Sequence, residues 1–298
     1  MPISTIQEKI KKNLSNIDFS IIEDIHFKPS KNLKKSILDD INIEIEIINE
    51  KKFYVYIKKN NFHEILANNF YYNYQRFDIQ RNELQKLKDS PSISWFLITM
   101  YYGAFFASNE ISNLAGYYNF NFSLEEKNML ISKNTSLNQG DVLDFINSDV
   151  KSYFGKLIPI EDEGRIQITC ESAGAKPHEL CWETLSKLLS GTIDADKRER
   201  TLRLRRILKA DKKFYWKRPN QIRNEWNYSK AELYSSHNEQ YIHDKNKYFN
   251  NFRELKRWAE TRYISPKNEN DDFISIMFLF NTLSLVMDNI KDDILDFN

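Results

Sequence analysis

The sequence has few residues that break regular structure, with seven glycines and seven prolines among 298 residues. So few breakers predict a helix-rich fold with few tight turns. Cysteine is also scarce. Cys170 and Cys181 are the only two, and no pair of histidines stands nearby at ligand spacing, so neither a disulfide framework nor a zinc site is indicated. We therefore expect no metal and no cofactor.

Two familiar catalytic motifs are missing as well. The chain has no glycine-rich loop that could cradle a phosphate and no G-x-S-x-G sequence. P-loop nucleotide hydrolysis and serine-hydrolase chemistry are therefore excluded from the main candidates.

Long hydrophobic runs are absent too. The two longest, at 93–107 and 273–287, have about fifteen residues each, whereas a membrane span needs roughly 20. The N-terminal sequence MPISTIQEKIKKNL lacks the apolar core of a signal peptide. We therefore expect both runs to form buried helices in a cytoplasmic protein that does not contact membranes.

Two segments have the alternation of apolar and polar residues that is typical of strands. Residues 41–48 (INIEIEII) and 53–57 (FYVYI) predict one β-hairpin. Residues 155–170 predict a second hairpin, which turns at Glu161–Gly164. Between the two hairpins, 117–150 is predicted to be a polar connection with one or two short helices.

The remaining sequence is mostly helical in pattern. Pro91–Gly116 is the best candidate for a central core helix, because proline suits a first helical position and glycine suits a helix end. We predict a mainly α fold: a helical bundle with two inserted or appended β-hairpins. A small α+β N-terminal portion would cover 1–75, and a helical domain carrying the second hairpin would cover 76–298.

Positive charge is concentrated in one segment. Lys197–Arg223 has twelve Lys or Arg against two acidic residues, although the net charge of the whole chain is +1. Phe214, Tyr215 and Trp216 interrupt these cations, and cations mixed with aromatic rings are typical of single-stranded nucleic-acid sites. The alternative is a solvated helix face balanced by acidic stretches elsewhere. The candidate nucleic-acid-binding residues are Arg203, Arg206, Lys209, Lys212, Lys213, Lys217 and Arg218.

The sequence IRNEWNYS follows directly and contains Arg223, Asn224 and Tyr228. Upstream are the aromatic-rich SWFLITMYYGAFFAS and then HELCWETLSKLL. In this order the three segments, over roughly 80–235, resemble the HEPN superfamily of all-α domains, which is common in prokaryotic toxin–antitoxin and antiphage systems. The motif of that family has an arginine, a polar residue and, four to six residues later, a histidine. Here Tyr228 stands in place of the histidine.

The resemblance implies a metal-independent endoribonuclease in which a 2′-hydroxyl attacks the neighbouring phosphate. Arg223 would stabilise the developing charge, and Asn224 would orient the arginine or cap the helix. Histidine moves protons because its pKa lies near neutrality, whereas the pKa of tyrosine is about 10. Tyr228 is thus a poor base but a good hydrogen-bond donor and stacking surface, which puts catalysis in doubt and leaves binding intact.

Other residues could supply the missing base or a different role. His178, His237 and His243 are candidate bases, although each is also an ordinary surface or capping histidine. Arg223 itself has a structural alternative, which is an ion pair with Glu225 or a buried carboxylate.

Three hypotheses follow. The first is a HEPN-like RNA-directed effector, a homodimer that cleaves RNA with an altered active site. The second is a catalytically inactive HEPN-like adaptor or sensor that binds nucleic acid or a partner protein of the same defence system. The third is an unrelated helical protein whose basic segment docks an acidic partner. The missing histidine favours the second over the first, and the Arg223–Asn224 pair favours both over the third.

Overall fold

The computed structural model describes most of the chain in two compact units, which are considered separately below. The described residues are 2–14, 32–90, 92–135, 138–160, 164–174, 177–190, 204–205, 207–208, 218–229, 239–261 and 269–295. Unit 1 consists of Met1–Lys9, Asn73–Ile111 and Cys181–Asp296, and unit 2 of Ile10–Tyr72, Ser112–Leu180 and Phe297–Asn298.

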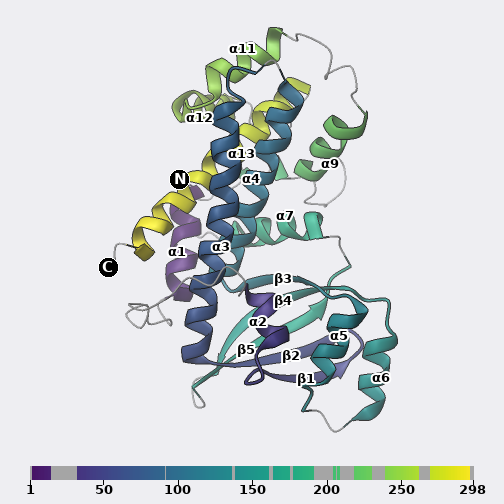
Figure 1. The fold of residues 1–298 in the computed structure, drawn as a ribbon. Helices are drawn as coiled ribbons and strands as arrows, with labels where there is room; N and C mark the ends of the chain where they lie inside the picture. The colour runs from purple at the N-terminus through teal and green to yellow at the C-terminus, as the bar shows by residue number, and fades with distance from the viewer. Residues whose placement is uncertain are drawn as a thin grey trace. The chain divides into compact units, whose positions relative to one another are not determined.

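Unit 2 is built on a five-stranded antiparallel sheet with the order β1-β2-β5-β4-β3 (Figure 1). Its strands are β1 (Glu44–Asn49), β2 (Lys52–Lys58), β3 (Tyr117–Asn121), β4 (Ser152–Ile160) and β5 (Arg165–Ser172). Both predicted hairpins are confirmed, as β1–β2 and β4–β5. They are not separate insertions, however, because β2 pairs with β5 from Lys52↔Glu171 to Lys58↔Arg165.

The third strand corrects the prediction for 117–150. β3 lies in the segment predicted to be a polar connection, followed by α5 (Leu124–Ile131) and α6 (Gln139–Asn147). Its sequence YYNFN alternates, so that Tyr118 and Phe120 are buried against the core. Because the sheet includes β3, β4 and β5, residues 112–180 belong with the N-terminal segment and not with the helical unit.

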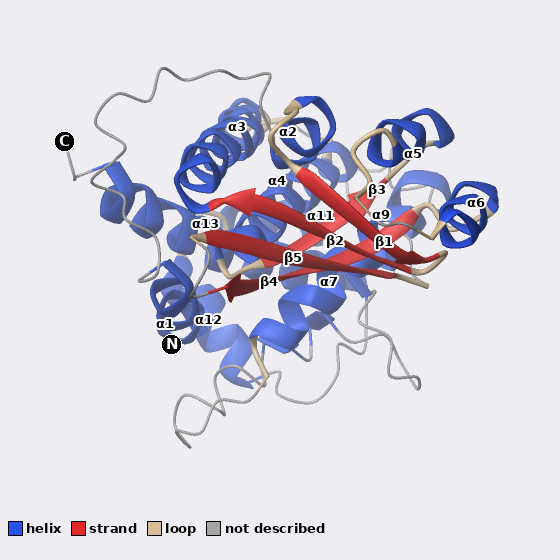
Figure 2. Ribbon diagram, turned by 90° about the horizontal axis from the view of Figure 1, so that it is seen from below, coloured by secondary structure: helices blue, strands red, loops and turns tan. Residues whose placement is uncertain are grey.

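One face of the sheet packs against helices. α2 (Leu33–Asp39), α5 and α6 lie on the same side of it (Figures 1 and 2). Phe53 is at the centre of this layer, with its ring centroid 6.0 Å from that of Phe122 and 5.6 Å from that of Phe145 on α6. Side chains at alternate positions of each strand thus form one continuous apolar core.

Local caps fix the ends of the covering helices. Ser123 and Glu126 form a capping box at the start of α5, in which each side chain accepts a hydrogen bond from the other residue's backbone N–H. Lys127 donates to the carbonyls of Phe145 and Ser148 at the end of α6, where carbonyls lack helical partners.

Unit 1 is helical throughout its described residues. It contains most of α4 (Ile93–Leu114) and α7 (Pro177–Leu188), the second half of α3 (Lys59–Lys86), and α9 (Arg218–Asn224). The other described helices are the larger part of α1 (Pro2–Leu14), α11 (Glu239–Tyr248), α12 (Phe252–Thr261) and α13 (Glu269–Leu295). A π-helical turn, η2 (Glu225–Ser229), continues directly from α9. These helices support the prediction of a mainly α fold. The sheet of unit 2 is larger than the two predicted hairpins.

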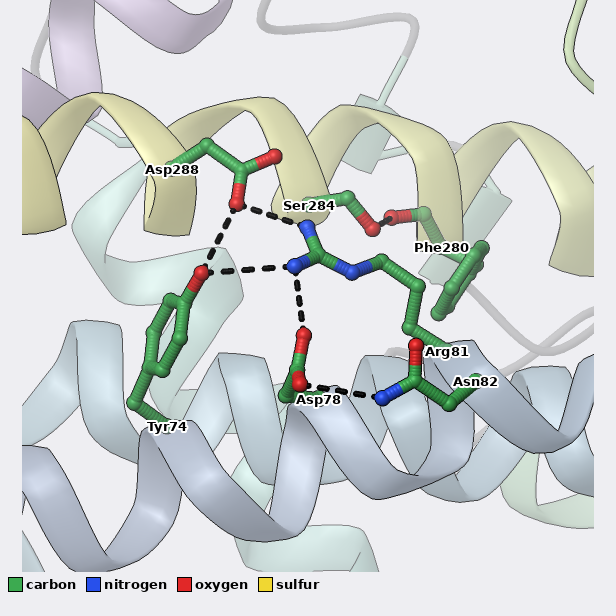
Figure 3. Close-up of polar contacts among 7 residues, drawn as sticks. All are labelled: Tyr74, Asp78, Arg81, Asn82, Phe280, Ser284 and Asp288. Carbon is green, nitrogen blue, oxygen red and sulfur yellow. Dashed lines mark hydrogen bonds and ion pairs between the residues drawn. The ribbon is translucent and has the colours of Figure 1, made fainter.

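The long helices α3 and α13 are joined by a polar cluster (Figure 3). Arg81 donates to Asp288 at 2.7 Å and to Asp78 at 2.5 Å, and Tyr74 donates to Asp288 at 3.2 Å. Nearby, Gly103 of α4 lies so close to Phe280 of α13 that a Cβ atom would come within 2.6 Å of the ring. A residue without a side chain is thus required where α4 meets α13.

The segments 93–107 and 273–287 are buried helices, as predicted. Asp272–Asp292 of α13 is long and apolar enough to cross a membrane by length and composition alone, but 72% of its apolar stretch is buried inside the protein. That burial is typical of the core helix of a soluble protein.

Candidate nucleic-acid site

The motif residues lie where α9 changes into the π turn η2. Pro219 occupies the first turn of α9, where a missing N–H costs nothing. After Asn224 the backbone widens into the π turn, and such turns inside α-helices are frequent at functional sites. The local geometry around Arg223 is thus unusual without any input from the resemblance.

Arg218 fixes the start of α9. Its Nη2 atom donates to Oδ1 and Oδ2 of the buried Asp272 on α13, at 2.6 and 2.5 Å. Its Nη1 atom lies 3.9 Å from Oε1 of Glu225. Glu225 is thus within ion-pair distance of Arg218. A guanidinium held by a buried carboxylate orients the segment that carries the motif.

Arg223 lies against two tyrosine rings of α4. Its guanidinium carbon is 5.6 Å from the ring centroid of Tyr101 and 5.8 Å from that of Tyr102. Both distances are within the range of a cation–π interaction. The Arg223 side chain is half-buried, and its buried Nε atom has no hydrogen-bond partner among the described residues. The aromatic contact holds the cation in place without neutralising it.

The floor of this site is rigid and apolar. Tyr101 is buried, stacks on Phe105 and meets Trp182 of α7 edge-on at 5.7 Å. Burial raises the pKa of Tyr101 well above its usual value. Burial also raises the pKa of the neighbouring Cys181 thiol to about 12. Both groups are therefore neutral near pH 7, and neither can supply an anionic nucleophile there.

The two aromatic residues of the π turn differ in exposure. Trp226 is buried, where it stacks on Phe273 at 5.8 Å and meets Tyr241 edge-on at 5.1 Å. Asn224 and Tyr228 face solvent, and Tyr228 is 74% exposed. An exposed aromatic ring and an exposed amide thus lie on the same short segment as the anchored Arg223.

Comparisons with known proteins assign no family to this arrangement. No family model, curated protein or solved structure matches the chain.

The geometry gives the site cations and rings, but the described residues provide no base next to Arg223. His243 is exposed on α11 and does not contact Arg223, while His178 is half-buried at the start of α7 in unit 2. Within the described ranges, no three His, Cys, Asp or Glu side chains are grouped so that they could hold a metal ion. The arrangement can bind an anion or stack a planar ring.

Several predicted residues lie outside the described residues. They are Arg203, Arg206, Lys209, Lys212, Lys213, Lys217 and His237. Of the basic segment before α9, Arg205 is described. Its Nε atom donates to Ser186 at 3.2 Å, and burial lowers its pKa. The prediction that the segment binds nucleic acid remains a prediction.

The sequence did not reveal the residues that support the motif. Tyr101 and Tyr102 were part of an apolar run, and nothing in that run distinguishes them as a cradle for arginine. Asp272 is 54 positions from Arg218, so no local spacing relates the two. The acidic residues Glu269, Asp271 and Asp272 at the start of a long apolar helix were the one available signal, and nothing in the sequence distinguishes Asp272 among them.

Proposed function

We propose that this chain is a HEPN-like, RNA-directed protein of a prokaryotic defence or toxin–antitoxin system that binds single-stranded RNA through α9 and η2. The observation that carries the proposal is the combination of Arg223, anchored on Tyr101 and Tyr102, with the exposed Tyr228 and Asn224. The HEPN-like assignment and the biological setting come from the sequence resemblance over roughly 80–235.

Each residue has a role that its chemistry supports. Among the described residues Arg223 contacts rings and pairs with no carboxylate, so its charge can hold a phosphate group. Tyr228 offers its ring to an unstacked base, and Asn224 offers donors and an acceptor to a base edge. Arg218 positions the segment through Asp272 and has less charge left for RNA.

Metal-independent cleavage of RNA is the second candidate, and the π turn after Asn224 favours it. Arg223 would stabilise the charge on the non-bridging oxygens, and Tyr228 or a histidine would have to move the proton. The proposal also includes a cytoplasmic location and a homodimer, with a partner protein of the same system as a further possible ligand.

An assay on total RNA with EDTA present tests both candidates. Wild type, Arg223→Ala and Tyr228→Phe are compared for binding and for the ends of any products. Binding that is lost in Arg223→Ala without any cleavage supports the binding protein. Products that end in a 2′,3′-cyclic phosphate and disappear in Arg223→Ala identify a ribonuclease. If RNA is neither bound nor cut, the proposal is wrong.

A further inference from the structure

The second face of the sheet in unit 2 differs from the face that packs on α2, α5 and α6. On that packed face the strands contribute buried apolar residues such as Val55 and Ile168. The alternate positions, which point to the other side, hold aromatic, amide, hydroxyl and charged side chains. The register places these side chains next to one another across all five strands.

Two rows of neighbours define this open face. In one row Glu46 pairs with Tyr54, then Tyr54 with Thr169, Thr169 with Lys156, and Lys156 with Tyr117. In the next row Glu44 pairs with Tyr56, Tyr56 with Gln167, and Gln167 with Ile158. We use "open face" below for these residues together with Lys52, Lys58, Phe154, Arg165, Glu171 and Asn119.

Ion pairs on the open face show that it is accessible to solvent. The side chains of Lys52 and Glu171 are 33% and 60% exposed, and those of Arg165 and Glu44 are 35% and 53% exposed. Ile158 is also exposed. These ion pairs lie near the strand ends, but Lys156 in the middle of β4 is exposed too, which a covered sheet would not allow.

Flat rings lie on both sides of the central strand β5 on the open face. Tyr117 and Phe154 are stacked, with ring centroids 5.8 Å apart and planes 24° apart. Tyr54 and Tyr56 lie on β2, next to the edge strand β1, with ring centroids 6.3 Å apart. The Tyr56 hydroxyl donates to Glu46 at 2.6 Å, which fixes its ring. Burial raises the pKa of Tyr56, so this hydroxyl stays protonated.

The charges on the open face favour an anionic ligand. Each carboxylate already has a partner on the face: Glu44 pairs with Arg165, Glu171 with Lys52, and Glu46 with the Tyr56 hydroxyl. Lys58 and Lys156 are exposed and form no ion pair with any described residue. The surplus charge is therefore positive and stands beside the rings.

Two of the partnered cations lie over rings. The Lys52 ammonium is 5.5 Å from the ring centroid of Tyr54, and the Arg165 guanidinium is 5.5 Å from that of Tyr56. A guanidinium plane over a ring extends the stacking surface available to a base. Between the rings, Gln167 donates to Thr169 at 3.0 Å, which leaves amide and hydroxyl groups available for base edges.

We infer that the open face of this sheet binds single-stranded nucleic acid. Unstacked bases would lie on Tyr54, Tyr56 and the Tyr117–Phe154 pair, and Lys58 and Lys156 would contact phosphates. Aromatic rings on an antiparallel sheet, flanked by cations that follow the backbone, are a known solution for single strands. This site uses residues of unit 2 alone and does not depend on Arg223.

The test measures the affinity of the full chain for fluorescent 12-nucleotide RNA and DNA strands and for a duplex of the same length, at several salt concentrations. Lys58→Gln combined with Lys156→Gln removes the proposed phosphate contacts. Tyr117→Val combined with Phe154→Val removes one ring pair and keeps residues that favour strands. Lys35→Gln is the matched control, because Lys35 is an exposed lysine on α2, on the packed side of the sheet.

The lysine pair should weaken single-strand binding and lower the slope of log K against log salt by about 1.4, which is two contacts at roughly 0.7 each. The valine pair should weaken binding about fivefold or more, since each stacked base contributes roughly 1–3 kcal/mol. Lys35→Gln should change neither quantity. Because the lysine variant removes no packing, it keeps the test valid even if the valine variant is unstable.

Three results would overturn the inference. The first is an unchanged affinity and salt slope in both variants. The second is tighter binding of the duplex than of the single strands, which would indicate charge attraction without stacking. The third is that the variants lose binding to a protein partner while their affinity for single-stranded nucleic acid equals that of the wild type. Repeating the series in Arg223→Ala separates the two sites, because the open-face variants should have the same fold effect there.

Discussion

The guanidinium of Arg223 lies 5.6 Å from the centre of the buried Tyr101 ring. This contact joins the motif segment to the aromatic helix α4. In the sequence resemblance these two segments are separate motifs. An arginine that rests on rings keeps its charge for a ligand, because in the described part of the chain no carboxylate pairs with it. The proposed function depends on this relationship.

Tyr102 tests the aromatic cradle. It is the half-buried one of the two rings, so its replacement disturbs the core less than a change at Tyr101. Tyr102→Leu should lower RNA affinity about two- to fivefold, because a cation–π contact is worth roughly 0.5–1 kcal/mol at such sites. Tyr102→Phe keeps the ring and should bind like wild type. Equal losses in both variants would show that the hydroxyl matters and not the ring.

Asp272 tests the anchor of α9. Asp272→Asn should lower the free energy of unfolding by about 2 kcal/mol, because it removes a charged partner from a guanidinium that is mostly buried. Urea denaturation of Asp272→Asn, Arg218→Met and the double variant gives the coupling between the two residues. Strictly additive losses would mean that the pair contributes nothing as a pair.

Gly103 tests the approach of α4 to α13. Gly103→Ala should destabilise the protein by about 1–2 kcal/mol, although alanine normally favours a helix, because the new methyl group would collide with the Phe280 ring. Phe280 is buried and packs against Phe77, so it has little room to move. Gly174→Ala is the control, since a Cβ there meets nothing within 4 Å. Gly103→Ala should unfold at a clearly lower urea concentration than Gly174→Ala. Equal midpoints would contradict the close packing of Gly103 on Phe280.

The buried thiols predict a pH dependence. The pKa of Cys181 is about 12 in the folded protein and 9.0 as its ordinary value. Above pH 9 the unfolded chain loses this proton while the folded protein keeps it, so stability should fall as pH rises from 9 to 12. The slope from one group is at most about 1.4 kcal/mol per pH unit. Cys181→Ala should flatten the curve, and an unchanged curve would contradict the burial of this thiol.

Local patterns predicted much of the fold. Alternation identified both hairpins, and the apolar runs identified α4 and α13. The pairing of β2 with β5 could not be predicted in the same way, because it joins two hairpins that are far apart in the chain. The local sequence of neither hairpin indicates which strand it pairs with. β3 was missed because its five residues lie within a polar stretch, although Tyr118 and Phe120 do alternate.

The site was predictable only in its outline. Arg223, Asn224 and Tyr228 stood out as a motif, and the structure describes all three on one short segment. The π turn and the cradle of Tyr101 and Tyr102 depend on tertiary packing, which overrides local preference. The motif segment lies in a part of the sequence that is helical in pattern, and its described residues form α9 followed by a π turn.

The most direct test of the account is the affinity of a short single-stranded RNA for wild type, Arg223→Ala and Arg253→Ala. Arg253 is an exposed arginine on α12 and serves as the control for the loss of one charge. We predict that Arg223→Ala weakens binding about tenfold and lowers the salt slope by about 0.7, while Arg253→Ala binds like wild type. Equal affinities for wild type and Arg223→Ala would contradict the account.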